Sequence, residues 1–455
     1  MDRELKIFIE NNFDFLVNLY NRYIRYLLRK SLIVEYYASP YMNLKGYPSP
    51  IFVNFCQKYY NKKNNVDSQY NHLKINFIKN IFFYFKLLFL FFFSFLFFSK
   101  NIKSNSVVIH GFHNNSNFEF NPYTTIKSPP FEYLQNKNIY HDINLSFVSF
   151  KGLFRYRKNS IIFSLRYLSS RDFFKLHLTA YKVFIQNRKI NISSISYVDI
   201  LFTLVKGTSI ASLINSLDKE SIYLNMWENR GHQLITDFLI EDKKKSLFLD
   251  LGITFRLAPE YMMFNYLRHD LKSKFLFMSD FNYNLLKKNL GNIDYQLFEN
   301  YRIDCKNYNS QSEKNRILLI SPLSMDVSFR LYQLILDNKE LDIKIRLHPY
   351  LNRDKFDNKH IEHRDIYKSL DDYDTIVYAG VTTASIELYF QGKKVYKFVS
   401  DEFIDIDPLV DNNLVKKIKS LNDIGSETKV YTEDEKNYYL GCNNKKLKEI
   451  LEKLN

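Results

Sequence analysis

The strongest constraint on the fold lies in residues 316–398, where short apolar segments alternate with helix-like segments. The apolar segments are 316–321, 342–347, 375–378 and 394–398, and the helix-like segments are 327–337, 361–370 and 383–391. A strand, a helix and a second strand in succession form a unit whose two strands run parallel. These residues therefore predict a parallel sheet flanked by helices.

A second α/β region is expected upstream of this one. Strand-like runs occur at 106–110, 143–150, 221–226, 246–249 and 274–278, and helical ones at 231–240 and 281–290. The polar stretch 308–315 is typical of a linker, and 434–454 is expected to be one long amphipathic helix. The predicted division is a helical, basic, membrane-associating extension at 1–103, a Rossmann-like domain at 104–310 and a second at 311–455.

The extension combines positive charge with the most apolar stretch of the chain. Residues 1–103 hold 15 Lys and Arg against 6 Asp and Glu, which accounts for +9 of the chain's net charge of +15. A basic balance indicates an anionic partner, and the apolar neighbour favours an anionic membrane surface over nucleic acid. No sequence typical of RNA recognition or of a zinc finger is present, so no nucleic-acid partner is expected.

The apolar stretch itself, residues 81–98, reads IFFYFKLLFLFFFSFLFF and is interrupted by Lys86 and Ser94. A spanning helix needs about 20 apolar residues, and the purest part, 87–98, would reach about 18 Å as a helix. A shallow or re-entrant membrane anchor, a transmembrane helix and a buried core helix all stay open. Lys and Arg flank both sides, so both are expected in the cytoplasm. The expected location is peripheral or monotopic at the inner face of the plasma membrane.

The cysteines are few and far apart. Cys56, Cys305 and Cys442 show neither a CxxC pattern nor a pairing with histidine. Such a set argues against a disulfide framework and against structural zinc. A reducing cytoplasm fits this usage.

The first candidate motif is Arg346-Leu347-His348-Pro349, at the end of a predicted strand. Ligands of open parallel sheets bind at the carboxyl ends of the strands. Pro349 disfavours helical geometry at His348, so the imidazole is expected on an extended turn. There it can contact a phosphate or protonate a leaving group, and Arg346 can add a charged contact. A His-Pro turn with a purely structural role is the alternative.

The second candidate motif follows the next strand of the same predicted sheet. It reads Gly380-Val-Thr-Thr-Ala-Ser-Ile-Glu387, a small-residue loop that leads into a helix. Hydroxyl groups and backbone amides at a helix start bind phosphate well. The candidate phosphate ligands are Thr382, Thr383 and Ser385, and Glu387, expected in the first turn, can accept hydrogen bonds from a ribose. Ordinary capping of the helix is the alternative.

Together these residues resemble the donor domain of GT-B glycosyltransferases that build bacterial surface carbohydrates. The resemblance rests on 342–396, with IRLHPY and YAGVTTASIELYFQGKKVY, and on DIDPL at 405–409. The His-Pro and Ser/Thr pair also occurs in bacterial sialyltransferases, capsule Kdo transferases and teichoic-acid polyol-phosphate polymerases. The resemblance implies a GT-B fold, with two Rossmann-like domains facing a cleft. It also implies that His348 and the 382–385 loop contact the phosphate and nucleotide of a CMP- or CDP-linked donor.

Two further segments are candidates for the acceptor side. Trp227-Glu-Asn-Arg-Gly-His232 follows a predicted strand and resembles, with altered order, a Glu-rich segment of surface-carbohydrate biosynthesis proteins. Glu228 there can deprotonate an acceptor hydroxyl, as an inverting transfer requires. The candidate acceptor ligands are Asn229, Arg230, His232 and, after the first strand of the upstream region, His113. Ordinary turns and helix caps are the alternatives at both places.

The preferred interpretation is a metal-independent, inverting glycosyltransferase with Glu228 and His348 as its catalytic residues. It would move a CMP-linked sugar, Kdo or sialic-acid-like, to a surface polysaccharide or lipid-linked glycan. No convincing DxD loop and no glycine-rich phosphate loop is present, so no metal or other cofactor is expected. The alternatives are a CDP-linked polyol-phosphate transferase, a nucleotide-sugar epimerase, a non-enzymatic membrane scaffold for polysaccharide assembly and, least favoured, a nucleic-acid binder.

Overall fold

The structure is a computed structural model of the whole chain. It describes residues 3–13, 15–17, 19–20, 50–64, 77–98, 101–111, 138–143, 161–189, 196–226, 231–241, 245–249, 272–284, 294–299, 316–322, 325–348, 351–364, 369, 372–380, 383–390, 392–400, 414–425, 432–442, 444, 446 and 449–450. The predicted linker at 308–315 and the DIDPL segment at 405–409 lie outside the described residues.

The upstream half contains a parallel sheet whose order is β3-β2-β1-β4-β5-β6-β7. Its strands are β1 (Ser106–Gly111), β2 (Asn138–Ile143), β3 (Ile161–Ile162), β4 (Ile222–Met226), β5 (Ser246–Leu249), β6 (Lys274–Phe277) and β7 (Tyr295–Leu297). The chain adds β2 and β3 on one side of β1, then returns to add β4 on the other side. The neighbouring strands β1 and β4 therefore form the switch point of this sheet, where doubly wound proteins bind ligands.

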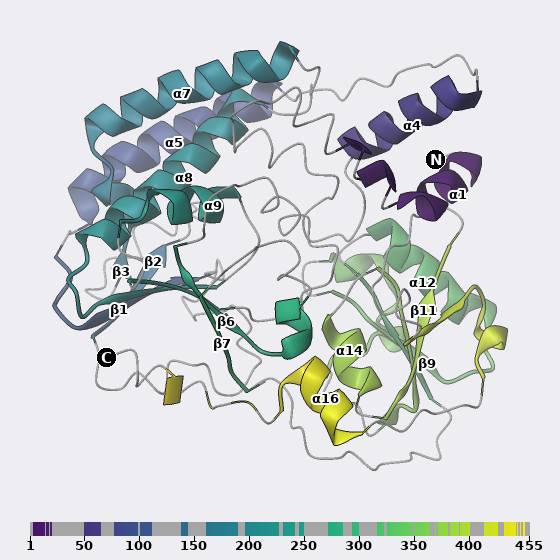
Figure 1. Ribbon diagram of the computed structural model, residues 1–455. Coiled ribbons are helices and arrows are strands. Elements are labelled where there is room, and N and C mark those ends of the chain that lie inside the picture. Colours follow the sequence, from purple (N-terminus) through teal and green to yellow (C-terminus); the bar gives the residue numbers. More distant parts are fainter. Residues whose placement is uncertain are drawn as a thin grey trace.

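Helices cover one face of the first sheet in a layer that Figure 1 shows above the strands. They are α5 (Phe77–Phe97), α7 (Ser170–Lys189), α8 (Tyr197–Ser216) and α9 (Gly231–Leu239), with a short 3-10 turn at Ser164–Tyr167. The capping box of Ser196 and Asp199 starts α8. Ile210 and Ile214 of α8 share a core with Val108 and Tyr223 of the sheet, so α8 is the helix that seals this face.

The downstream half contains a second parallel sheet, ordered β12-β11-β10-β8-β9. Its strands are β8 (Ile317–Ile320), β9 (Ile343–Arg346), β10 (Thr375–Tyr378), β11 (Lys394–Phe398) and β12 (Lys416–Ile418). The central strands are buried on both faces: α12 (Met325–Asp337) packs on one and α14 (Thr383–Tyr389) on the other. The chain is therefore α/β with two parallel sheets, which is compatible with two Rossmann-like domains.

The two halves contact each other through both ends of the chain. Helix α16 (Glu433–Leu440) lies beside α14 in Figure 1, and its Tyr439 ring packs on Phe281, which follows β6, with 4.8 Å between centroids. Beyond it, Ile450 is buried in the core of the first sheet. At the other end, Lys6 of α1 (Arg3–Asn11) donates to the carbonyl of Ser400, which follows β11. The contacts of Tyr439 and Lys6 use residues that follow the carboxyl end of a strand.

The amino-terminal residues join the helical layer. Alongside α1, the structure has a second helix here, α4 (Pro50–Asn64). Buried residues of α1 and α4, such as Ile9 and Phe52, belong to the same hydrophobic core as Phe91 of α5 and Phe173 of α7. Helix α5 is packed into the helical layer of the first sheet. The boundary of the extension at residue 103 stays a prediction.

Several sequence expectations are wrong in detail. The structure has a strand at Asn138–Ile143 that the sequence did not indicate, and the strand expected at 143–150 lies, apart from residue 143, outside the described residues. The helix expected at 361–370 does not include 361–364, because the amide of Glu362 donates to the carbonyl of Ile345 along the edge of β9. The helix expected at 434–454 ends at Gly441. Cys442 takes part in a disulfide bond, so the reduced state expected for it is wrong.

Gly441 gives a test of the contact between the halves. It ends α16 at φ +70°, and a Cβ added there would lie 1.6 Å from the carbonyl oxygen of Met278. Gly392 also has a positive φ, of +81°, but a Cβ there would meet nothing within 4 Å. Gly392→Ala should cost about 1 kcal/mol from backbone strain alone. Gly441→Ala should cost about 3 kcal/mol or more, because backbone must also move.

The measurement is the urea midpoint of both variants against the wild-type chain. Equal midpoints for Gly441→Ala and Gly392→Ala would contradict the close approach of α16 to the carboxyl end of β6.

Candidate functional site

The switch point of the second sheet lies at the carboxyl end of β8. The chain places β9 on one side of β8 and β10 on the other. The loops that leave the adjacent strands β8 and β10 therefore run in opposite directions and open a crevice between them. Ser321 directly follows β8, and His348 and Gly380 lie two positions after the ends of β9 and β10. The topology thus brings the His-Pro motif and the Gly380 loop to one edge, as the sequence predicted.

His348 is held at this edge by its backbone. Its amide donates to the Ser321 hydroxyl at 3.0 Å, and the Ser321 amide donates to the Arg346 carbonyl, also at 3.0 Å. Ser321 is only 4% exposed, so the hydroxyl that orients His348 is fixed in the interior. The carbonyl of His348 in turn accepts from the amide of Leu351.

The electrostatic environment keeps the His348 side chain neutral. Burial lowers its pKa below the usual 6.5, because a charged imidazolium loses solvation in the interior. A neutral imidazole can donate one hydrogen bond and accept another. A bound phosphate would favour the charged form and raise the pKa again, so anion binding and protonation at His348 are expected to be coupled.

Gly380 brings the backbone of the β10 loop close to that of β8. Its φ is +68°, and a Cβ at this position would lie 2.7 Å from the Cβ of Pro322. The carbonyl of Gly380 accepts a hydrogen bond from Lys397 Nζ. Lys397 is 1% exposed, and its ammonium lies 4.8 Å from the centroid of the Tyr378 ring. The Lys397 side chain thus links β11 to the residue that follows β10.

The predicted donor ligands on α14 differ in where they lie. Thr383 is the first residue of the helix, whereas Thr382 and Pro349 lie outside the described residues. Ser385 and Glu387 are fully buried. The sequence predicted Glu387 in the first turn of the helix. It lies beyond that turn, because α14 begins at Thr383. Their contacts to a donor stay predictions.

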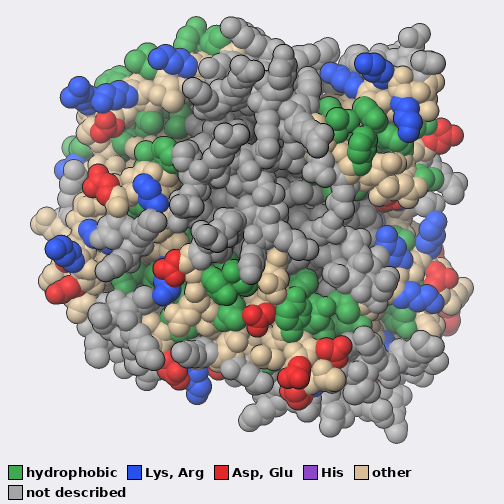
Figure 2. All heavy atoms as spheres, in the orientation of Figure 1, with side chains coloured by type: hydrophobic (Ala, Val, Ile, Leu, Met, Phe, Trp, Pro, Cys, Tyr) green, Lys and Arg blue, Asp and Glu red, His purple; other side chains and the backbone are tan. Residues whose placement is uncertain are grey.

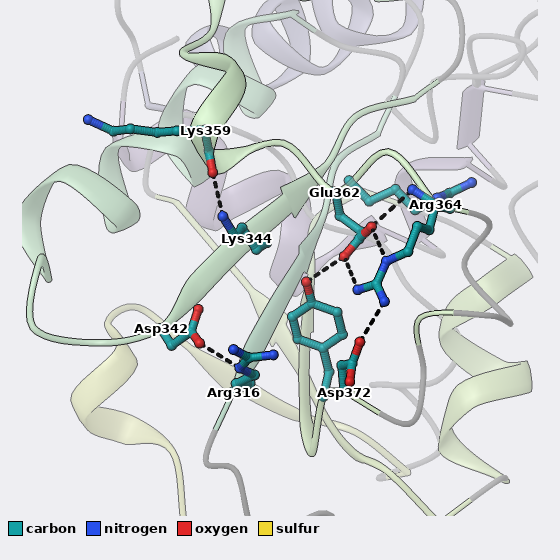
Figure 3. A network of polar contacts seen from close by, with 9 residues as sticks. Arg316, Asp342, Lys344, Lys359, Glu362, Arg364 and Asp372 are labelled. Atoms are coloured by element: carbon teal, nitrogen blue, oxygen red, sulfur yellow. Dashed lines mark hydrogen bonds and ion pairs between the residues drawn. The ribbon is translucent and has the colours of Figure 1, made fainter.

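Figure 3 shows a network of polar contacts beside β9 that includes Glu362, Arg364 and Asp372, and Arg346 joins it. Its guanidinium donates to the carbonyl of Arg364. Arg364 lies between two carboxylates, 2.8 Å from Glu362 and 2.6 Å from Asp372, and the Tyr373 hydroxyl donates to Glu362 at 2.6 Å. This network fastens residues 361–364 to β9 and so supports the strand that ends at His348. A contact of Arg346 with a donor stays a prediction.

The acceptor-side predictions are described only in part. Glu228, Asn229, Arg230 and His113 lie outside the described residues. His232 lies in the first turn of α9, is 6% exposed, and has its ring 6.2 Å from that of His110 between centroids. The structure thus places one predicted residue at the carboxyl edge of the first sheet.

Sequence reasoning missed two residues of the second edge, Ser321 and Lys397. Ser321 was included in a predicted strand, and a serine directly after a run of buried apolar residues was the available signal. Lys397 carried no signal, because a lysine in a strand gives no indication that its ammonium reaches back to a neighbouring loop. Across the described ranges, no group of three His, Cys, Asp or Glu side chains is arranged to hold a metal ion.

A comparison with protein-family models finds no match for the chain, and a comparison with curated protein sequences finds none either. Function is therefore inferred from the fold, from the two sheet edges and from the sequence resemblance.

The Glu362 network gives a pH-dependent prediction. Hydrogen bonds from Arg364 lower the pKa of Glu362 from 4.5 to about 2. A lowered folded-state pKa means that the stabilisation is complete above pH 4.5 and is lost as the pH falls toward 2. The loss should be on the order of 2 kcal/mol, less than the shift alone implies, because Arg364 is half exposed and solvent screens its charge.

Urea midpoints measured from pH 6 to pH 2 test this. Glu362→Gln should be less stable than the wild-type chain at pH 6 and should lose less stability between pH 4.5 and 2, whereas Glu340→Gln, at an exposed turn, should follow the wild type. An unchanged pH profile in Glu362→Gln would show that the ion pair does not stabilise this edge.

Proposed function

We propose that the chain is a GT-B glycosyltransferase that binds a nucleotide-activated donor at the carboxyl edge of its second sheet. The observation that carries the proposal is the convergence of Ser321, His348, Gly380 and Lys397 on the switch point of a doubly wound sheet. The first sheet is also doubly wound, and Ile450, near the end of the chain, is buried in its core. Both observations support the two-domain arrangement.

The donor is a CMP-linked sugar, of the Kdo or sialic-acid type. This part of the proposal rests on the resemblance of the His-Pro and Thr/Ser segments to transferases that use cytidine nucleotides. His348 contacts the donor phosphate, and its coupling to protonation lets it stabilise the charge that develops as CMP leaves. Lys397 contributes positive potential through its fixed ammonium. We expect the transfer to be inverting and metal-independent, with protonated His348 and Lys397 as the basic groups of this edge.

The acceptor is a surface polysaccharide or lipid-linked glycan, which the enzyme reaches at a membrane. The support is a stripe of exposed apolar side chains along α5, formed by Phe82, Phe85, Phe89, Phe92 and Leu96. These follow a spacing of three, four, three and four residues, so they share one side of the helix. The opposite side, with Leu87, Leu90 and Phe91, is buried in the core, so α5 is neither a wholly buried helix nor one surrounded by lipid.

A second stripe on α7 extends this surface. Phe174, Leu178, Tyr181 and Ile185 are exposed. The two helices run antiparallel, because Tyr84 contacts His177 while Phe91 stacks on Phe173 at 4.0 Å between centroids. In an antiparallel pair, residues one position after each contact residue face the same side. Phe85 and Phe92 of α5 therefore lie on the same side of the pair as Phe174 and Leu178 of α7.

The charge around this two-helix surface suits an anionic bilayer. Helices α5 and α7 carry seven Lys and Arg and a single Asp, and Arg171, Lys175 and Lys182 are exposed on α7. In Figure 2, basic and hydrophobic side chains lie together at the upper left, where Figure 1 places α7. Basic residues beside a large apolar surface are typical of helices that lie in the lipid interface. The proposed location is the cytoplasmic face of the plasma membrane.

One helix in the described part of the chain is long and apolar enough to cross a membrane, namely α8, Tyr197–Ser216. Of its most apolar window, 72% is buried inside the protein, where it seals the first sheet. We therefore assign α8 to the core and the membrane contact to α5 and α7.

Nucleotide binding gives the first test of this function. Purified full-length chain is screened by thermal shift against CMP, CDP, UMP, UDP and GDP, with and without magnesium. CMP should raise the melting temperature without metal, and its affinity should increase about tenfold from pH 8 to pH 6, because the phosphate favours protonated His348. His348→Gln should bind more weakly and lose most of this pH dependence.

The control is His360→Gln, which lies on an exposed turn of the same half and should retain the wild-type response. Stabilisation by UDP in place of cytidine nucleotides would overturn the donor assignment. No response to any nucleotide would favour the membrane scaffold.

Membrane contact gives an independent test. The full chain should float with vesicles of phosphatidylcholine and phosphatidylglycerol and much less with phosphatidylcholine alone. Replacing Phe85 and Phe92, which are 63% and 61% exposed, by Glu should reduce bound protein at least about tenfold. Replacing Leu336 and Leu341, which are 39% and 40% exposed on the other half, by Glu adds the same charge and should have little effect. Equal loss in both double variants would contradict a specific two-helix surface.

A further inference from the structure

The carboxyl edge of the first sheet carries a row of buried polar side chains that the proposed donor site does not use. Asp142 of β2, His110 of β1 and Asn225 of β4 are direct neighbours in the strand register. Residues paired in register on parallel strands point to the same face of the sheet. Two positions earlier, the same register holds Tyr140, Val108 and Tyr223, which are part of the core under α8. The polar row thus begins where the hydrophobic core ends.

Hydrogen bonds fix the proton positions within this row. Asp142, which is fully buried, accepts from the Ser164 amide at 2.8 Å and from the Tyr223 hydroxyl at 2.9 Å. Its Oδ2 atom also lies 3.2 Å from His110 Nδ1. Burial beside Asp142 raises the pKa of Tyr223 well above its ordinary value, so this hydroxyl remains a donor. A carboxylate with these neighbours holds a proton on Nδ1 of His110, which leaves the lone pair on Nε2.

The third member of the row, Asn225, has an unused donor. The Asn225 side chain is fully buried, and Gln233 of α9 donates to its Oδ1 atom at 3.1 Å. Among the described residues, its Nδ2 atom has no hydrogen-bond partner. A buried amide donor without an acceptor is costly, and a hydroxyl oxygen of a bound sugar would satisfy it.

Helix α9 is placed against this row by close packing. A Cβ added to Gly207 of α8 would lie 2.7 Å from the carbonyl oxygen of His232, so only glycine lets the start of α9 approach so closely. Thr236 reinforces the approach by donating to the Gly207 carbonyl at 3.1 Å. This contact holds His232 and Gln233 beside His110 and Asn225.

We propose that the Asp142–His110–Asn225 row is the acceptor site and that His110 is the general base of the transfer. The proposal rests on the proposed glycosyltransferase function and assigns the base to a residue other than Glu228. The row lies at the switch point of its sheet, and residues after the carboxyl ends of strands form the contacts between the halves. Its chemistry suits a neutral hydroxyl group, which needs one acceptor for its proton and one donor to its oxygen.

The step balances as follows. The acceptor hydroxyl oxygen forms a bond to the anomeric carbon of the donor sugar while its proton passes to His110 Nε2. The bond between that carbon and the CMP phosphate oxygen breaks, and its electron pair leaves with CMP. Asp142 stabilises the resulting imidazolium, in the manner of other histidine–carboxylate pairs, and His110 later releases the proton to solvent.

The test uses full-length chain with CMP-N-acetylneuraminate and CMP-Kdo as labelled donors and membrane lipids of the source organism as acceptors. His110→Gln and Asp142→Asn should each reduce kcat at least about a hundredfold, while thermal stabilisation by CMP and the KM for the donor stay within about threefold. The wild-type rate should fall on the acidic side as His110 gains a proton, and His110→Gln should lack this limb. Within the described residues, the titratable groups that face His110 are Asp142, Tyr223 and His232, so His232→Gln is run in parallel and should keep the limb.

Wild-type kcat in His110→Gln, with CMP binding intact, would overturn the base and leave the proposed function standing. Failure of the wild-type chain to bind CMP or to transfer either sugar would instead overturn the donor assignment, and the base proposal with it. A donor-independent readout is the ¹⁵N spectrum of histidine-labelled chain, assigned with His110→Gln. The His110 signals should show a protonated Nδ1 that is lost in Asp142→Asn, and a proton on Nε2 in the wild type would also overturn the proposal.

Discussion

The parallel arrangement of strands is the constraint on which the rest of this molecule depends. Parallel neighbours can be joined only by crossovers, so both faces of each sheet must be covered, and every strand delivers its carboxyl end to the same edge. In the second sheet, α12 and α14 provide the covers, and in the first, α8 and the segment around Ile450 provide them. Polar residues excluded from these cores are left at two edges, where Ser321 orients His348 and Asp142 orients His110.

The sequence predicted the second half better than the first, for a physical reason. Strands such as Ile317–Ile320 and Thr375–Tyr378 are uniformly buried, so they appear as unbroken apolar runs between helical segments. In the first half, β3 and β7 are only two and three residues long and carry little pattern. The helix expected over 434–454 ends instead at Gly441, a left-handed cap residue that lies too close to the Met278 carbonyl to carry a side chain. Amphipathic spacing does not register such a contact.

The candidate site was predictable in position but not in its partners. A His-Pro pair after a strand and a Gly-Val-Thr-Thr loop after the next are sufficient to expect one shared edge. Ser321 and Lys397 act through contacts that depend on which strands are neighbours, and strand order is not written in local sequence. The same applies to His110 and Asp142, which are 32 residues apart and become a pair only because β1 and β2 lie in register. Asp142 lies in β2, before the first residue of the strand expected at 143–150.

Binding of a cytidine nucleotide at the carboxyl edge of the second sheet is tested most directly by hydrogen–deuterium exchange with and without CMP. We expect slower amide exchange in peptides that contain Ser321, His348 and Gly380, with no change in β2 or at the start of β1. Protection confined to the first sheet, or no protection at saturating CMP, would contradict it.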